Sequence, residues 1–211
     1  MKPDALLERI AHERATAILR TDDQGRARRA MDAAVRGGMR VVEFTLTVPG
    51  VFELIEEFAS RDGVVVGAGT VLTPAQANQA VDAGARFLVS PVVDEEVIAV
   101  ARARDVVAMP GVHTPTELLR AHRAGAQLQK LFPAPAGGPA WVRSVLGPMP
   151  FLKIVPTNGT SAENARAWLE AGAFACGFVA SLFPAELVQG QRWDEIETRA
   201  AAILAATRRE S

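Results

Sequence analysis

Eight strand-like runs that alternate with helical segments predict a closed (β/α)8 TIM barrel with a short N-terminal helix. Strands that alternate with helices imply right-handed βαβ units and a parallel sheet, and these units recur at intervals of roughly 20–25 residues. The phrases DAGAR, RAGAQ and EAGAF mark the same joint, at which a helix stops and a strand starts. An open doubly wound sheet is the alternative, although it usually has fewer units. No segment reads as a linker, so residues 1–211 are expected to form one domain.

Four strands and their helices are predicted in the first half of the chain. Apolar runs predict strands at residues 15–20, 39–47, 64–70 and 87–91. A charged amphipathic helix at residues 6–14 precedes them, and periodicity predicts helices at residues 24–36, 51–60, 73–84 and 95–104. Gly37 and Gly38 supply the C′ position that ends the helix before them. Thr73 and Gln76 match a capping box with Pro74 at the first helical position, which predicts a helix start.

The second half of the chain repeats this pattern four times. Strands are predicted at residues 106–109, 128–132, 151–156 and 174–179, and helices at residues 114–125, 139–146, 160–172 and 193–208. Thr114 and Glu117 form a second capping-box pattern, again followed by a proline at the first helical position. Thr160 and Glu163 predict a third capped helix start, directly after the seventh strand.

Composition and charge narrow the class of protein. The chain has 211 residues, of which 49% are hydrophobic, and a formal net charge of −1, so no nucleic-acid or membrane partner is expected. The longest apolar runs are too short and too often interrupted by glycine to span a bilayer. The N-terminal segment reads as a charged amphipathic helix rather than a signal peptide, and a single cysteine excludes an internal disulfide. These features predict a cytoplasmic protein.

Lys130 is the first candidate catalytic residue because it lies in the middle of an apolar strand. Alternation puts its side chain on one face with Leu128 and Phe132, and puts Gln129 and Leu131 on the other face. Poor solvation disfavours the charged form of an amine. A neutral amine can attack a ketone and form a Schiff base. The alternative is a lysine that merely pairs with a carboxylate or extends its amine towards the strand end.

Glu43 is the second candidate because alternation turns it into the barrel. Val41, Glu43, Thr45 and Thr47 share one face of the second strand, whereas the apolar residues between them would pack against helices. A buried carboxylate costs several kcal/mol unless it is paired or used. Glu43 and Lys130 are therefore expected to be close, either as an ion pair that fills the barrel or as a general acid/base beside an imine-forming lysine.

Other strand ends supply candidate substrate ligands, because the chemistry of such barrels lies at the C-terminal ends of the strands. The third strand ends in GAGT, where glycines permit a close approach to the backbone and Thr70 offers a hydroxyl. The seventh strand runs into Thr157, Asn158 and Gly159, a turn expected to lead into a helix N-terminus that suits an anion. A tight loop without a ligand is the alternative for this turn.

Three further residues carry weaker signals. His113 follows the fifth strand, but no second histidine or carboxylate stands at ligand spacing, so no metal is expected. Lys153 lies early in the seventh predicted strand, nearer the bottom of the barrel, and is expected to be structural. Cys176 lies on an apolar strand and is expected to be an inert core residue.

Six motifs, taken together and in order, resemble those of the 2-keto-3-deoxy-6-phosphogluconate / 4-hydroxy-2-oxoglutarate aldolases. They are VVEFTLT, VGAGTVLTP, FLVSP, MPGVHTPTE, QKLFPA and IVPTNG, and the similarity runs from about residue 15 to residue 184. The resemblance implies a class I aldolase with a (β/α)8 barrel. It also implies a homotrimer that acts on a small-molecule keto acid and uses no metal or cofactor.

The same resemblance implies a role for each matching residue. Lys130 would be the Schiff-base lysine and Glu43 the proton-transferring acid/base. Thr70 would bind the carboxylate of the pyruvate-derived part, and Pro91 and Phe132 would line the pocket. The distal end of the substrate would fall to four residues: Arg20 and the backbone of Thr157, Asn158 and Gly159.

The chain departs from the family pattern in three places. Thr47 stands where the family usually has an arginine that grips the carboxylate, so the carboxylate would rest on Thr47, Thr70 and backbone N–H groups, and pyruvate would bind weakly. Asn158 replaces the first glycine of a Gly-Gly pair, and Val179-Ala180 replaces a Gly-Ser pair that helps to bind phosphate. The last two departures predict a preference for an unphosphorylated or smaller substrate.

Three functions remain open on the sequence alone. The leading one is an aldolase that cleaves a 2-keto-3-deoxy or 4-hydroxy-2-oxo acid, with 2-keto-3-deoxy-6-phosphogluconate among the candidates, into pyruvate and an aldehyde. A phosphosugar isomerase or epimerase would need two acid/base groups and no essential lysine. A non-catalytic or altered-specificity barrel that binds a small sugar acid is suggested by Thr47. The presence of both Glu43 and Lys130 argues against this last reading, because a non-catalytic barrel has little reason to bury that pair.

Overall fold

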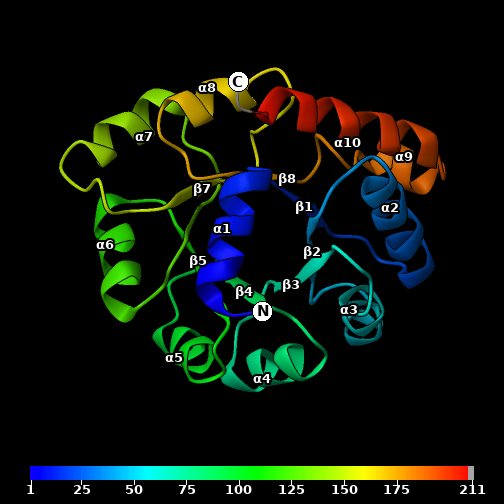
Figure 1. Ribbon diagram of the computed structural model, residues 1–211, viewed down its shortest axis with the longest axis horizontal. Helices are drawn as coiled ribbons and strands as arrows, with labels where there is room; N and C mark the ends of the chain where they lie inside the picture. Colours follow the sequence, from blue (N-terminus) through cyan, green and yellow to red (C-terminus); the bar gives the residue numbers. More distant parts are fainter. Residues whose placement is uncertain (209–211) are drawn as a thin grey trace.

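Eight parallel strands form the barrel that the alternation of strands and helices predicts, and Figure 1 shows the helices as an outer ring around them. The structure is a computed structural model and describes residues 1–208. Neighbouring strands follow the order β7-β6-β5-β4-β3-β2-β1-β8, and a parallel bridge between Thr157 and Gly177 joins the two ends of this row. The strands are β1 (Ala15–Leu19), β2 (Val41–Thr45), β3 (Val65–Gly69), β4 (Phe87–Ser90), β5 (Val107–Val112), β6 (Gln129–Leu131), β7 (Ile154–Pro156) and β8 (Cys176–Phe178).

Helix α1 (Pro3–Glu13) precedes the barrel, and a helix follows each strand. The helices after the first seven strands are α2 (Gln24–Arg36), α3 (Val51–Ala59), α4 (Pro74–Asp82), α5 (Glu95–Ala103), α6 (Pro115–Ala124), α7 (Gly138–Leu146) and α8 (Ala165–Glu170). Two helices follow β8, namely α9 (Ala185–Gln189), which the sequence did not predict, and α10 (Trp193–Thr207). Within residues 1–208, no helix is long and apolar enough to cross a membrane.

Two of the three predicted N-cap residues, Thr73 and Thr114, are at the N-cap position in the structure. The Thr114 hydroxyl accepts a hydrogen bond from the backbone N–H of Glu117, and the Glu117 carboxylate accepts one from the backbone N–H of Thr114. Thr73 likewise accepts from the backbone N–H of Gln76, but the Gln76 side chain bonds the N–H of Leu72 instead of completing the box. Both helices therefore start with satisfied N–H groups, as the capping pattern predicts.

The third cap was predicted wrongly. The Thr160 hydroxyl donates to the backbone carbonyl of Gly177 at 2.6 Å, so it ties the loop to β8 instead of capping a helix. Helix α8 begins only at Ala165, with Asn164 in the N-cap position. The Asn164 side chain is bonded to the loop before it, to the N–H of Ser161 and the carbonyl oxygen of Gly159. A tertiary hydrogen bond has displaced the local one.

Several strands are shorter than the apolar runs that predicted them. The second strand ends at Thr45, where the N–H of Val48 turns back to bond the Thr45 carbonyl oxygen at 3.0 Å. Thr47 therefore lies beyond β2. The seventh strand begins at Ile154, so Lys153 lies just before it. Strand ends are set by where the ladder of hydrogen bonds stops, and an apolar run does not mark that point.

Apolar side chains fill the N-terminal end of the barrel. Leu6, Leu7 and Ile10 of α1 pack with inward-facing residues of the strands, among them Val41 and Leu128. Figure 1 shows α1 lying across the centre of the ring. Because α1 closes the barrel interior at this end, the C-terminal ends of the strands are where polar side chains of the interior meet solvent.

Candidate active site

A cavity of about 200 Å³ opens at the C-terminal ends of the strands, with Lys130 in its wall. Its lining comes from the ends of both early and late strands: Ile18, Arg20, Thr45, Thr70, Pro91, Lys130, Phe132, Thr157, Asn158 and Val179. Ten residues were given a catalytic or substrate-binding role from the sequence, and seven of them belong to this set. Of the other three, Glu43 is buried next to the lysine, and Thr47 and Gly159 lie outside the lining.

Lys130 reaches the cavity from the middle of β6, where alternation places it. Its side chain is 11% exposed, and its Nζ lies 5.4 Å from the centre of the Phe132 ring. The nearest carboxylate oxygen is Oε1 of Glu43, at 3.7 Å. The predicted proximity of the two residues is present in the structure, but their separation is longer than a hydrogen bond.

Glu43 on β2 is completely buried. Neither of its carboxylate oxygens has a hydrogen-bond partner among the residues that the structure describes. Burial raises the pKa of the Glu43 carboxyl above its ordinary value, although the nearby charges of Lys130 and Arg20 act in the opposite direction. A carboxyl group with a raised pKa and two unoccupied oxygens is suited to accept and return a proton.

Two glycines make room for this arrangement. A Cβ at Gly69, at the end of β3, would lie 2.0 Å from Oε1 of Glu43. A Cβ at Gly111 on β5 would lie 2.2 Å from the carbonyl oxygen of Pro91. The glycine of the GAGT motif is therefore required by the glutamate on the neighbouring strand, which is a close approach of the kind that glycine in a strand indicates.

Thr70 and Asn158 both adopt left-handed backbone conformations at the rim of the cavity. Each has a φ of 61°, a region that non-glycine residues rarely occupy and that costs about 1–3 kcal/mol. The strain is greatest for Thr70, because its side chain is branched at Cβ. The Thr70 hydroxyl accepts a hydrogen bond of 3.2 Å from Nη2 of Arg20, across the end of the barrel.

Thr47 and Gly159 lie outside the cavity that Lys130 lines. The Thr47 hydroxyl is 2.8 Å from the hydroxyl of Thr45, and Thr47 lines a neighbouring cavity of about 420 Å³. Gly159 uses its carbonyl oxygen to accept from the Asn164 side chain. The expected helix N-terminus directly after Gly159 is also absent, because α8 starts at Ala165.

Residues expected to be structural or only weakly functional lie away from this centre. The Lys153 amine lies 5.6 Å from the centre of the Phe174 ring. Cys176 is buried, and burial raises the pKa of its thiol to about 12. His113 contacts the carbonyl oxygen of Pro133 through Nδ1 at 3.1 Å. Across the described part of the chain, no group of three or more His, Cys, Asp or Glu side chains is arranged to hold a metal ion.

Two lining residues were missed by the sequence reasoning although the signal was present. Ile18 shares its face of β1 with Arg20, and Thr45 shares its face of β2 with Glu43, so alternation alone could have placed both. Val179 was noted only as a departure from the family pattern. It lines the cavity directly.

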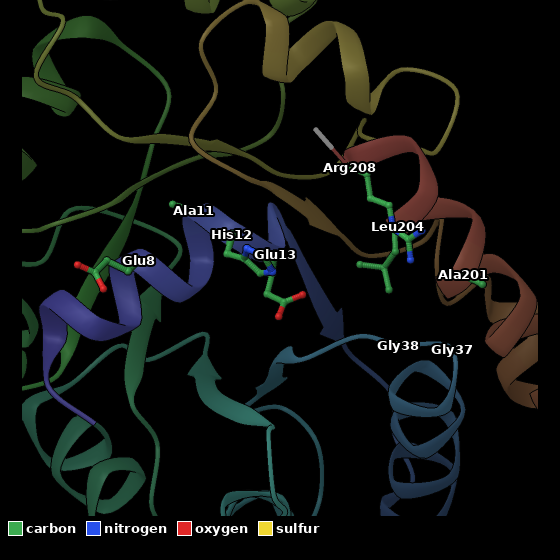
Figure 2. A pocket seen from close by; sticks show the side chains of 9 residues that line it. All are labelled: Glu8, Ala11, His12, Glu13, Gly37, Gly38, Ala201, Leu204 and Arg208. Carbon is green, nitrogen blue, oxygen red and sulfur yellow. The ribbon is translucent and has the colours of Figure 1, made fainter. Parts of the chain in front are cut away.

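A larger cavity, of about 820 Å³, lies at the opposite end of the barrel. Figure 2 shows side chains of α1, including Glu8 and Glu13, on one side of it, and Leu204 and Arg208 at the end of α10 on the other. Neither Lys130 nor Glu43 is near it. Active sites of (β/α)8 barrels lie at the C-terminal ends of the strands, which favours the smaller cavity as the catalytic site.

Comparisons with known proteins agree with this geometry. A family model described as KDPG and KHG aldolase matches residues 6–199. The probable 2-dehydro-3-deoxy-6-phosphogalactonate aldolase of Rhizobium meliloti (strain 1021) is 36% identical over 193 residues, which cover 90% of this chain and 89% of that protein. The KHG/KDPG aldolase of Escherichia coli (strain K12) is 34% identical over 166 residues, which cover 78% of each chain.

A solved structure extends the comparison to the fold. The KDPG aldolase of Legionella pneumophila, with pyruvate captured at low pH as a covalent carbinolamine intermediate, superposes with a TM-score of 0.84. It is 28% identical, and the match covers 96% of this chain and 98% of that one. The relatives are named aldolases, which are lyases. With the family match spanning most of its length, the chain belongs to the KDPG and KHG aldolase family.

Proposed function

We propose that this protein is a class I aldolase in which Lys130 forms a Schiff base with the ketone of a 2-keto-3-deoxy or 4-hydroxy-2-oxo acid. The products are pyruvate and an aldehyde. The observation that carries the proposal is the position of the Lys130 amine, in the wall of the cavity and 3.7 Å from a fully buried carboxylate. An ion pair that served only to fill the barrel would be expected to close to hydrogen-bond distance.

The first half of the reaction uses the amine. Nζ of Lys130, in its neutral form, attacks the ketone carbon and forms a carbinolamine. The carbinolamine takes up a proton from the site or from solvent and loses water, which leaves a protonated imine; the same proton is released when the imine is finally hydrolysed. The imine nitrogen then accepts the electron pair of the bond between the third and fourth carbons. That bond breaks as the hydroxyl on the fourth carbon gives up its proton, and the aldehyde departs.

Glu43 moves the protons in this scheme. Its carboxylate takes the proton of the hydroxyl on the fourth carbon, directly or through a water molecule, and returns it to the terminal carbon of the enamine. The imine of pyruvate then adds water and releases pyruvate, which regenerates the lysine. Burial supports this role, because it raises the pKa of Glu43 towards the range in which a carboxyl group both accepts and donates protons near neutral pH.

The remaining lining residues shape the cavity around the imine. Pro91 and Phe132 give it apolar walls beside the lysine, and Phe132 holds its ring 5.4 Å from Nζ. Thr157 and Asn158 lie on the side of β7, where the distal end of the substrate would rest. The N–H of Thr157 donates to the Leu131 carbonyl oxygen at 2.9 Å, and its hydroxyl donates to the Val155 carbonyl oxygen at 3.4 Å, so the hydroxyl oxygen is left to accept from a ligand.

A homotrimer is part of the proposal. Leu72 and Val92 are large apolar side chains that are 48% and 54% exposed, in the loops after β3 and β4. Apolar side chains at that end of the barrel are suited to burial against a second chain. Sedimentation equilibrium should give a mass three times that of the 22.5 kDa chain. A mass equal to one chain would contradict the trimer but would leave the proposed reaction unaffected.

Borohydride reduction in the presence of pyruvate tests the Schiff base. The parent protein should gain one reduced pyruvate adduct, and peptide mass spectrometry should place it on Lys130. Lys130→Met should lose both the adduct and turnover, whereas Lys153→Met is the matched control and should keep the adduct. An adduct on Lys153, or none at saturating pyruvate, would remove the proposed mechanism. Turnover without any adduct would favour an isomerase or epimerase.

A further inference from the structure

We propose that the hydroxyl of Thr45 carries a proton from the substrate to Glu43, which makes Thr45 a further catalytic residue. This inference rests on the proposed function, because it takes the ketone carbon to be bonded to Lys130 and Glu43 to be the group that finally holds the proton. It concerns one step, the removal of the proton from the hydroxyl on the fourth carbon of the substrate. Protonation of the enamine carbon remains the task of Glu43 itself.

Glu43 lies beneath the cavity and does not form part of its wall. The residue is completely buried, and it is not among the described residues that line the cavity. Its Oε1 lies 3.7 Å from Nζ of Lys130, so the carboxylate is close to the atoms that adjoin the imine. The third carbon of the substrate is attached to the imine carbon, whereas the hydroxyl is carried by the next carbon along, towards the rim. The carboxylate therefore reaches the third carbon more easily than the hydroxyl.

Thr45 is placed to bridge this gap. It is the next inward-facing residue of β2 after Glu43, and it lines the cavity. Gly69 is the partner of Thr45 in the register between β2 and β3, and a Cβ on Gly69 would lie 2.0 Å from Oε1 of Glu43. The Glu43 side chain thus extends along the barrel to the level of Thr45. On β2, Thr45 is the residue that lies both at the level of the carboxylate and in the cavity wall.

The hydrogen-bonding capacity of Thr45 matches this role. Its hydroxyl oxygen is 2.8 Å from that of Thr47, which is exposed at the end of the turn after β2. A hydroxyl has one proton to donate and two lone pairs that accept. When Thr47 donates to Thr45, the Thr45 hydroxyl keeps its own proton for Glu43 and a lone pair for the substrate hydroxyl. The Glu43 oxygens accept no hydrogen bond from any described residue, so they are free to receive that proton.

The transfer conserves atoms and electrons. The substrate hydroxyl gives its proton to Oγ1 of Thr45 as the Thr45 proton passes to the Glu43 carboxylate. The electron pair of the broken O–H bond becomes the second bond of the aldehyde carbonyl, and the pair of the broken carbon–carbon bond moves into the enamine, which neutralises the imine nitrogen. Protonated Glu43 then gives the proton to the terminal carbon of the enamine. Thr45 ends the cycle as a neutral hydroxyl.

Two reactions of the same protein separate the role of Thr45 from that of Glu43. Cleavage needs the proton of the substrate hydroxyl, whereas exchange of the pyruvate methyl protons with deuterated solvent needs only the third carbon. Thr45→Val replaces the hydroxyl with a methyl group and should slow single-turnover cleavage about tenfold, the size of one hydrogen bond. Methyl exchange, and the pyruvate concentration that gives half-maximal borohydride trapping on Lys130, should keep their parental values.

Cleavage is measured as release of the aldehyde from the 4-hydroxy-2-oxo acid or the 2-keto-3-deoxy acid, whichever the parent cleaves faster. Thr45→Ser keeps the hydroxyl and should restore nearly the parental rate. Thr16→Val is the matched control, because it removes a second buried threonine, on β1 and outside the cavity lining among the described residues. It should leave cleavage and exchange unchanged.

Three results would overturn the inference. Parental cleavage by Thr45→Val would show that the proton bypasses Thr45. Equal slowing of cleavage and exchange would show that Thr45 only positions Glu43. A Thr45→Ser protein as slow as Thr45→Val would show that the hydroxyl is not the group that matters. Absence of both adduct and cleavage in the parent protein would instead remove the proposed function.

Discussion

Two groups of oppositely charged side chains differ in how closely their charges meet. One group lies inside the barrel, and the other lies between α2 and α3 on its outer surface. On the surface, Glu57 accepts a hydrogen bond of 2.7 Å from Arg28 and one of 2.6 Å from Arg61. Inside the barrel, Lys130 and Glu43 stand 3.7 Å apart, and the glutamate oxygens lack hydrogen bonds from any residue that the structure describes. The partly exposed cluster around Glu57 is therefore hydrogen-bonded, whereas the buried pair of Lys130 and Glu43 is not.

The two carboxyl groups respond to their surroundings with opposite pKa shifts. Burial is the largest influence on both and acts to raise each pKa. For Glu57 the hydrogen bonds from Arg28 and Arg61 outweigh it, so the pKa of Glu57 is lowered and its charge is held fixed. For Glu43 burial prevails and the pKa is raised. The surface cluster therefore keeps the charge of Glu57, whereas the raised pKa of Glu43 suits the proton transfer that the proposed function assigns to it.

The largest expected effect is on proton transfer by Glu43. Glu43→Gln should leave the fold and the pyruvate adduct intact but slow the exchange of pyruvate methyl protons with deuterated solvent by roughly 10²–10⁴. Proton NMR measures this rate. Glu57→Gln removes the same charge from the surface cluster and should exchange at the parental rate. A Glu43→Gln protein that exchanges as fast as the parent would exclude Glu43 from the mechanism.

The second effect is on stability and belongs to the surface cluster. Glu57→Gln should lower the free energy of unfolding by about 1 kcal/mol, because it removes the charge that meets both Arg28 and Arg61 at a partly exposed site. Urea denaturation measures the loss. Glu56→Gln, one residue earlier on α3 and exposed, is the control and should be near neutral. Equal stability of the two variants would mean that the cluster contributes nothing.

The third effect is a pair of opposite pH dependences. Because the folded-state pKa of Glu43 is raised, the folded protein holds its proton more tightly, and Glu43 costs stability as pH rises above its ordinary value of 4.5. Over that range Glu43→Gln should therefore become more stable relative to the parent, in free energy of unfolding. The lowered pKa of Glu57 does the reverse, since its contribution is present above 4.5 and is lost as pH falls below it. Measured against the parent, the unfolding free energy of Glu43→Gln should rise as pH increases above 4.5, whereas that of Glu57→Gln should rise as pH falls below 4.5. A series from about pH 3 to pH 8 covers both ranges. Parallel curves would contradict the assigned shifts.

The smallest effect concerns the part of the cavity rim that follows β8, where side-chain donors for an anion are few. Val179 lines the cavity, Ala180 cannot donate from its side chain, and the Ser181 hydroxyl is buried without a partner in the described chain. One lost neutral donor is worth roughly two- to tenfold in binding. We therefore expect kcat/KM for the unphosphorylated 2-keto-3-deoxy acid to exceed that for the phosphorylated one by a factor of this size. A clear preference for the phosphorylated acid would show that the rim has other anion ligands.

The parts of the structure that follow a simple period were predictable from the sequence. The strand period of two, applied to the second and sixth strands, brought Glu43 and Lys130 together, and the alternation of strands and helices gave the barrel. Thr47 was misplaced by the same rule, because the chain turns after Thr45 and the period stops there. The rule holds only while the ladder of hydrogen bonds continues, and that limit depends on neighbouring strands.

Features that depend on contacts between distant segments were not predictable. Thr160 matched a cap pattern but bonds Gly177 on another strand, so α8 starts later. Helix α9 has five residues, too few for a helical period to show. The hydrogen bond between Arg20 and Thr70 joins residues 50 positions apart, through a backbone conformation that no propensity would assign to threonine.

Helix α1 has a consequence for the order of events in catalysis. Its apolar side chains pack into the N-terminal end of the barrel, so substrate and both products share the opening at the other end. On the proposed chemistry, the pyruvate part is bonded to Lys130, while the aldehyde lies towards the rim. The aldehyde must then leave before pyruvate is freed, and the enzyme follows an ordered scheme with one substrate and two products. In such a scheme pyruvate competes with the substrate for the free enzyme, whereas the aldehyde meets only the enamine and drives the reaction backwards.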